Sequence, residues 1–223
     1  PVSPIESGTQ LFIYASVSDN VGVASVEVFG SQTIASGPNA GQSFVGPVYN
    51  LNYNASTGLY SNDFSVGFTG SLVLNITAKD AAGNAVSTTS TVLVQDTTAP
   101  AFGVVTTVSS TYKAGESISF SQSITDVVGV KQANVTFNGV VYEMTLDPVG
   151  SYAANTSLPT LPGIYYYSIS VVDYDGNANA TSSYDVVVTN ADAALIVLTV
   201  QPLFVVAGDA VIVSAHVEDA YGN

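Results

Sequence analysis

The sequence predicts an all-β chain, and three observations support this fold class. Apolar and polar residues alternate along many short stretches, which is the side-chain period of a β-strand. Val, Ile, Thr and Tyr dominate these stretches, and no window shows a convincing helical period. Asp, Asn, Gly and Pro separate the stretches, as expected of turns. Because the chain has 223 residues, we expect about two domains, each with its own core.

A spacing between glycine and aspartate repeats along the chain and indicates its organisation. In three places a glycine is followed eleven residues later by an aspartate and then by a second glycine: Gly8, Asp19, Gly22; Gly115, Asp126, Gly129; and Gly208, Asp219, Gly222. A second pair recurs, with Gly70 ten residues before Asp80 and Gly163 ten residues before Asp173. We therefore predict two complete repeats, over 1–97 and 98–190, and the first strands of a third, incomplete repeat over 191–223.

Equivalent strands of the repeats place apolar residues at equal offsets from these glycines. Residues at alternating positions are predicted to face a core on five strands: Leu11, Ile13, Ala15, Val17; Leu72, Leu74, Ile76, Ala78; Ile118, Phe120, Gln122, Ile124; Tyr165, Tyr167, Ile169, Val171; and Val211, Val213, Ala215, Val217. On this register Phe120 should pack against Tyr167 in one core. About seven short strands in each repeat favour an immunoglobulin-like β-sandwich. The fold class is therefore tandem immunoglobulin-like sandwiches in an extended array.

Three stretches also carry a resemblance to a known family: "DNVGVASVEV", "AKDAAGNAVSTTSTVLVQDTTAP" and "VVDYDGNANATSSYDVVV". They resemble the tandem bacterial and archaeal immunoglobulin-like repeats (Big-type) of adhesins, S-layer proteins and stalks of exported proteins. The resemblance covers both complete repeats and the start of the third. It implies an extracellular, non-catalytic protein of the cell surface.

Charge and composition limit the partners and the chemistry. Three Lys and no Arg stand against 17 acidic residues, which gives a net charge of -14. Nucleic acid and anionic membranes are therefore disfavoured, and cations are the natural counter-species. The absence of Cys excludes disulfides and Cys-ligated zinc. No apolar run is long enough for a membrane span, and the start at Pro1 suggests a processed chain or an excised fragment.

The acidic turns are candidate metal ligands. In an immunoglobulin-like topology Asp126, Asp173 and Asp175 would converge near Asp96, in the linker after the first repeat. Carboxylate oxygens at this density suit calcium, which takes six to eight oxygen ligands. Asp is also favoured in turns because its side chain accepts hydrogen bonds from nearby backbone N–H groups. The first repeat offers two such carboxylates, so a site there is less expected.

Five Asn-X-Ser/Thr sequons are candidate glycosylation sites: Asn54, Asn75, Asn134, Asn155 and Asn179. About three such short motifs would arise by chance in this composition. Asn75 and Asn134 fall on the outward register of predicted strands, where a glycan has room. Glycans are therefore a candidate modification.

Catalytic groups are scarce. The one His, His216, falls on the outward register of a predicted strand. Tyr165, Tyr166 and Tyr167 suggest a sugar-stacking platform, but alternation leaves only Tyr166 facing solvent. We do not expect an enzyme.

Two classes of function remain. The preferred one is a structural cell-surface protein, such as an S-layer, filament or sheath component that self-associates into a lattice or fibre. The alternative is an adhesin or stalk that presents a binding domain lying outside this sequence. The strands in 193–223 would be completed either by the rest of a third repeat or by strand donation to a neighbouring subunit.

Overall fold

The computed structural model describes residues 4–104, 111–201, 206–208 and 210–223, and these form strands and turns without a helix. The all-β prediction is therefore confirmed. Two compact units are present: the first contains Pro1–Ala101, Ile124–Gln132 and Val171–Asn179, and the second contains Phe102–Ser123, Ala133–Ser170 and Ala180–Asn223. The predicted repeat boundaries at 97/98 and 190/191 stay predictions.

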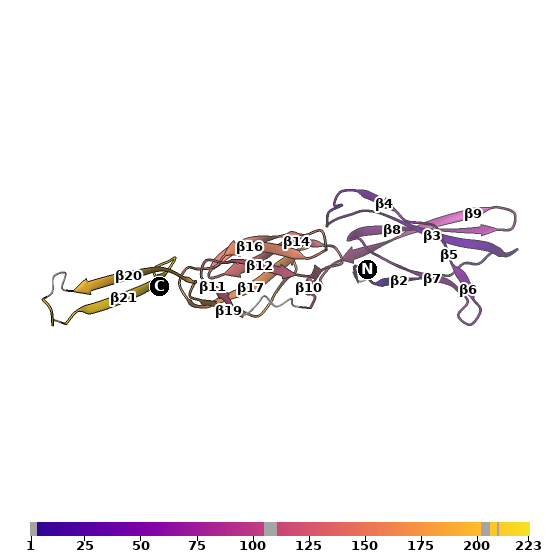
Figure 1. Ribbon diagram of the computed structural model, residues 1–223. Coiled ribbons are helices and arrows are strands. Elements are labelled where there is room, and N and C mark those ends of the chain that lie inside the picture. The colour runs from indigo at the N-terminus through magenta and orange to yellow at the C-terminus, as the bar shows by residue number, and fades with distance from the viewer. Residues whose placement is uncertain (1–3, 105–110, 202–205, 209) are drawn as a thin grey trace. The chain divides into compact units, whose positions relative to one another are not determined.

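The first unit is a sandwich of two mainly antiparallel layers (Figure 1). A short strand at the edge of one layer pairs in parallel with its neighbour. One layer has the order β1-β9-β8-β3-β4, with β5 also paired to β3, and the other has the order β2-β7-β6. The strands are β1 (Ile5–Glu6), β2 (Gln10–Ala15), β3 (Val23–Thr33), β4 (Ser43–Val45), β5 (Tyr49–Asn50), β6 (Asn52–Asn54), β7 (Leu59–Ser65), β8 (Gly70–Asp80) and β9 (Ala85–Gln95).

The core of this unit follows the predicted alternation. Leu11 and Ile13 on β2 are buried against Leu72 and Leu74 on β8, together with apolar residues of β3 and β9. Residues between them on each strand point to the other face. A shift of one residue would exchange the two sets, so burial of one face fixes the register.

The remaining strands form a second sandwich and two separate pairs. An eight-stranded sheet has the order β11-β19-β17-β14-β15-β16-β12, with β18 paired to β17, while β10 pairs β13 and β20 pairs β21. Their bounds are β10 (Ala101–Phe102), β11 (Thr111–Lys113), β12 (Ser117–Gln122), β13 (Ile124–Thr125), β14 (Val130–Phe137), β15 (Val140–Leu146), β16 (Tyr152–Ser157), β17 (Gly163–Asp173), β18 (Ala178–Ala180), β19 (Tyr184–Thr189), β20 (Ala193–Gln201) and β21 (Ile212–Asp219).

Aromatic rings fill the core of the second unit. The ring centroid of Phe120 lies 4.8 Å from that of Tyr167 and 5.5 Å from that of Phe137, and both pairs of rings are tilted. All three are buried, and offset or tilted rings at such distances attract each other. The predicted pairing of Phe120 with Tyr167 is confirmed, and Tyr166 is exposed as expected.

The hairpin of β20 and β21 differs from the sequence-based expectation. Val211, Val213, Ala215 and Val217 were predicted to face a core, but all four are exposed. The reason is that β20 and β21 pair only with each other among the described strands, so no second layer covers them. A lone hairpin has no interior.

Candidate cation centre

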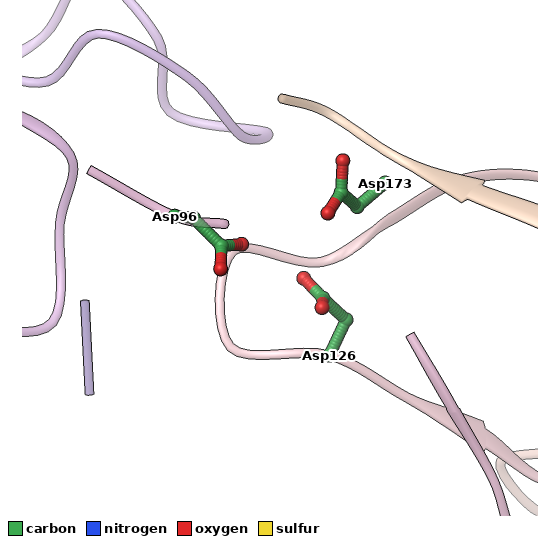
Figure 2. A group of neighbouring side chains, drawn as sticks. All are labelled: Asp96, Asp126 and Asp173. Atoms are coloured by element: carbon green, nitrogen blue, oxygen red, sulfur yellow. The ribbon is translucent and has the colours of Figure 1, made fainter. Parts of the chain in front are cut away.

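Three aspartates, each at the end of a strand, bring their carboxylates together. All three belong to the first compact unit, which includes Ile124–Gln132 and Val171–Asn179. Asp96 follows β9, Asp126 follows β13, and Asp173 is the last residue of β17. One carboxylate oxygen from each lies within 4.8 Å of the other two. Figure 2 shows the three side chains pointing into one common space.

Two of these carboxylates are held by tight turns. The Oδ1 of Asp126 accepts hydrogen bonds from the backbone N–H groups of Val128 (2.9 Å) and Gly129 (2.8 Å). This leaves its Oδ2 without a hydrogen bond among the described residues. Gly129 has a φ of 107°, a conformation that L side chains rarely adopt. The Asp-x-x-Gly spacing therefore orients the carboxylate.

The Asp173 carboxylate accepts more hydrogen bonds from its turn than the Asp126 carboxylate does. Its Oδ1 accepts three backbone N–H groups, from Asp175, Gly176 and Asn177, at 2.6 to 2.8 Å. Its Oδ2 accepts the side-chain amide of Asn177 at 2.7 Å. Asp173 is 0 % exposed, and the charged hydrogen bonds offset part of the cost of burying its carboxylate.

Asp96 lies in the linker after β9, which is anchored by Glu6. Glu6 accepts hydrogen bonds from the backbone N–H of Thr97 (2.7 Å) and from the hydroxyls of Thr97 and Thr98 (2.9 Å each). The Thr97 backbone bond is the largest cause that lowers the pKa of Glu6 to about 2. The side-chain amide of Asn177 also donates to the backbone oxygen of Asp96 (3.1 Å). The linker is thus fixed against the Asp173 turn.

The electrostatics of Asp96 are unfavourable without a counter-charge. Burial is the first cause that raises its pKa to about 6; a side-chain hydrogen bond to Glu6, which needs a proton, and the negative charges of Asp126 and Asp173 add to the rise. Its Oδ1 accepts the N–H of Thr98 at 3.1 Å. Its Oδ2 is buried and accepts no hydrogen bond from a described residue, and Asp96 as a whole is only 6 % exposed. A buried carboxylate oxygen of this kind costs free energy unless a proton or a cation compensates it.

The geometry fits a divalent cation with oxygen ligands. Two oxygens bound to one calcium ion at 2.3–2.6 Å lie at most about 5 Å apart, and the three carboxylate oxygens meet that limit. Calcium would complete its shell with water or backbone oxygens, because it accepts six to eight ligands in irregular geometry. No described Lys or His forms an ion pair with any of the three carboxylates. An ion held there would cross-link the three chain segments that carry these carboxylates.

The fourth predicted ligand, Asp175, is outside the group of three carboxylates. Its Oδ2 accepts a hydrogen bond from the hydroxyl of Ser36 at 2.7 Å. Sequence reasoning also missed the roles of Glu6 and Asn177. The Asn177 role has a visible signal, because Asp-x-x-Gly-Asn recurs at Asp80 and Asp219; the Glu6 role depends on a contact 91 residues away and has none.

The five candidate glycosylation residues all lie on strands. Asn54, Asn155 and Asn179 are exposed, while Asn75 and Asn134 are partly buried on β8 and β14. Their neighbours Leu74, Ala133 and Val135 are buried, so the predicted outward register holds. The side-chain amide of Asn179 donates to the backbone oxygen of Pro100 (2.9 Å). Glycosylation of the sequons stays a prediction.

His216 lies at the surface as predicted. Its side chain is 70 % exposed and pairs with Glu218 at 2.6 Å.

Among the residues that the structure covers, no helix is long and apolar enough to cross a membrane.

No family model and no curated protein sequence matches the chain. Solved structures match the chain at low similarity. The fibronectin(III)-like modules of Clostridium thermocellum CbhA are 18 % identical with a TM-score of 0.35, over 85 % of this chain and 92 % of that one. The amphioxus IgVJ-C2 molecule is 10 % identical with a TM-score of 0.42, over 83 % and 99 %. A Ca2+-stabilized adhesin of an Antarctic bacterium is 16 % identical with a TM-score of 0.31, over 88 % and 48 %. Similarity at this level does not bear on function.

Proposed function

We propose that this chain is a structural, non-catalytic component of a cell surface, in which calcium bound by Asp96, Asp126 and Asp173 stabilises the first unit. The single observation that carries the proposal is the buried, unpartnered Oδ2 of Asp96 in a group of three carboxylates. A cation there would compensate charge on three segments that are distant in sequence. It would therefore join the linker at Asp96 to the turns at Asp126 and Asp173.

The extracellular part of the proposal has separate support. The repeated strand pattern, the net charge of -14 and the scarcity of catalytic groups favour a scaffold such as an S-layer, filament or sheath. Extracellular fluids also offer the calcium concentrations at which modest carboxylate sites fill. Imaging of the purified chain for ordered sheets or fibres, with calcium and with a chelator, tests the assembly role.

Thermal unfolding tests the cation site. Calcium that binds only the folded chain at about 100 times its dissociation constant should stabilise it by about 2.7 kcal/mol. We expect the melting temperature to rise with millimolar calcium chloride after chelator treatment, and to rise less with magnesium, which dehydrates reluctantly.

A matched pair of variants separates the site from general charge effects. Asp126→Asn keeps an oxygen acceptor for the turn but removes the charge from the site, so the calcium shift should disappear. Asp147→Asn is the control, because Asp147 accepts the N–H groups of Val149 and Ser151 in a similar turn outside the group of three. An unchanged melting temperature in wild type, or an equal shift in Asp126→Asn, would contradict the proposal.

A further inference from the structure

A shallow hollow lies on the outer face of the three-stranded layer of the first unit. Phe12 and Tyr14 project from β2 on the face opposite the buried Leu11 and Ile13. They are 61 % and 65 % exposed. The hollow has a volume of about 500 Å³ and is also lined by residues of β6 and β7.

Strand register places these rings beside a row of polar side chains. Phe12 lies opposite Asp63 on β7, and Tyr14 lies opposite Ser61. Asn52 on β6 lies opposite Ser61 on the other side. The two rings are therefore spaced by about 7 Å along one strand, with hydrogen-bonding groups on the neighbouring strands.

The polar side chains of the hollow are available to a ligand. The side chains of Asn52, Ser61 and Asp63 make no hydrogen bond to another described residue. The backbone beneath them is held in place, because the side chain of Asn62 donates to the Asn50 carbonyl and accepts the Asp63 N–H, each at 2.8 Å. The hydrogen-bonding groups thus stand on a fixed strand, which lowers the ordering cost of binding.

Phe12 and Tyr14 are more exposed than Phe44, the exposed ring on β4 of the other layer, which is 37 % exposed. On the outer face of the other layer, the corresponding positions of β9 carry Ser87, Thr89 and Thr91. Two exposed rings cost solvation free energy that a Ser or Thr would avoid. Contiguous exposed rings rimmed by polar groups are typical of a binding surface.

We propose that this hollow binds a neutral oligosaccharide. A pyranose ring has an apolar C–H face that stacks on the negative face of an aromatic ring, as at Phe12 and Tyr14. Its hydroxyl groups both donate and accept, which matches the amide of Asn52, the hydroxyl of Ser61 and the carboxylate of Asp63. Asp63 and the net charge of -14 repel anionic polysaccharides. The alternation of rings and polar groups favours a sugar over the apolar face of a second copy.

Binding of soluble hexasaccharides to the intact chain tests this inference. The neutral probes are cellohexaose, mannohexaose and chitohexaose, and the anionic probe is heparin hexasaccharide. Isothermal titration calorimetry should detect binding of at least one neutral probe and no binding of the anionic probe. Loss of one stacked ring, in Phe12→Ala or Tyr14→Ala, should weaken binding about tenfold, and the double variant should abolish it.

Tyr166→Ala is the matched control, because Tyr166 is 59 % exposed on β17 of the second unit. It should bind as wild type does, and all variants should keep the wild-type melting temperature because the changed rings are exposed. The inference is overturned if none of the three neutral probes binds at millimolar concentration, or if the double variant binds unchanged. It is also overturned if the double variant loses self-association, measured by light scattering, but still binds the saccharide.

Discussion

The turns at Asp80 and Asp173 have the same sequence pattern and the same hydrogen bonds to the Asn four residues later, yet only one contributes to a carboxylate cluster. In each, an Asn four residues later donates its backbone and side-chain N–H groups to the aspartate. In each, the backbone N–H of the aspartate donates to the carbonyl of that Asn, at 3.0 Å for Asp80 and 3.1 Å for Asp173. Asp80 is partly exposed, whereas Asp173 is fully buried.

The difference arises from what packs on the turn. The side chain of Asn177 has a second acceptor, the backbone oxygen of Asp96, and Asp96 brings a further carboxylate to Asp126 and Asp173. The Asp80 turn has no third carboxylate within reach among the described residues. The Asp-x-x-Gly-Asn pattern therefore specifies a turn, and a linker docked on that turn turns it into a candidate cation site.

Replacement of each aspartate by alanine, in separate variants, should show the difference between the two turns most clearly. Asp173→Ala removes a fully buried carboxylate that accepts three backbone N–H groups, and we expect a loss of about 2 to 4 kcal/mol in the free energy of unfolding. Asp80→Ala should cost much less, because water can reach the N–H groups of that turn. Denaturant unfolding followed by tyrosine fluorescence measures both. Equal losses would mean that docking of the linker adds nothing to the turn.

The sequence predicted those features that depend on local period and spacing. Burial of Phe120 and Tyr167 followed from alternation, because strand register determines which face is buried. The convergence of Asp96, Asp126 and Asp173 followed from the expected topology. Asp175 could not be separated from Asp173 in advance, since its position depends on a contact with Ser36, 139 residues away. The exposed rings of Phe12 and Tyr14 were missed because alternation was used only to find the inward positions.

The linker at Asp96 and the turn at Asp80 should also differ in the sign of their pH dependence. The pKa of Asp96 is raised from its ordinary 3.8 to about 6, chiefly by burial. Between these values the unfolded chain releases a proton that the folded chain retains, so stability falls as pH rises from about 4 to 6. The pKa of Asp80 is lowered, first by the side chain of Asn84. Its contribution is therefore present above its ordinary value and lost as pH falls below it.

Melting temperatures between pH 4 and 7 in a chelator measure the Asp96 contribution. We expect the wild-type melting temperature to fall over this range as pH rises, and the fall to be much smaller in Asp96→Asn, which keeps an acceptor for the Thr98 N–H but cannot ionise. Calcium should also reduce the fall, because the ion favours the ionised carboxylates. A fall of the same size in Asp96→Asn would assign the dependence to other groups.

The smallest expected effect comes from the two asparagines. Asn177→Ala removes two side-chain hydrogen bonds, to the Asp173 Oδ2 and to the backbone oxygen of Asp96, whereas Asn84→Ala removes one, to the Asp80 Oδ2. We expect Asn177→Ala to cost about 1 to 2 kcal/mol of unfolding free energy and Asn84→Ala less, since Asn84 is exposed. If docking of the linker positions Asp96 in the group of three, Asn177→Ala should also weaken the calcium-dependent rise in melting temperature, while Asn84→Ala should leave that rise unchanged. Equal calcium responses in the two variants would show that Glu6 alone suffices to position the linker.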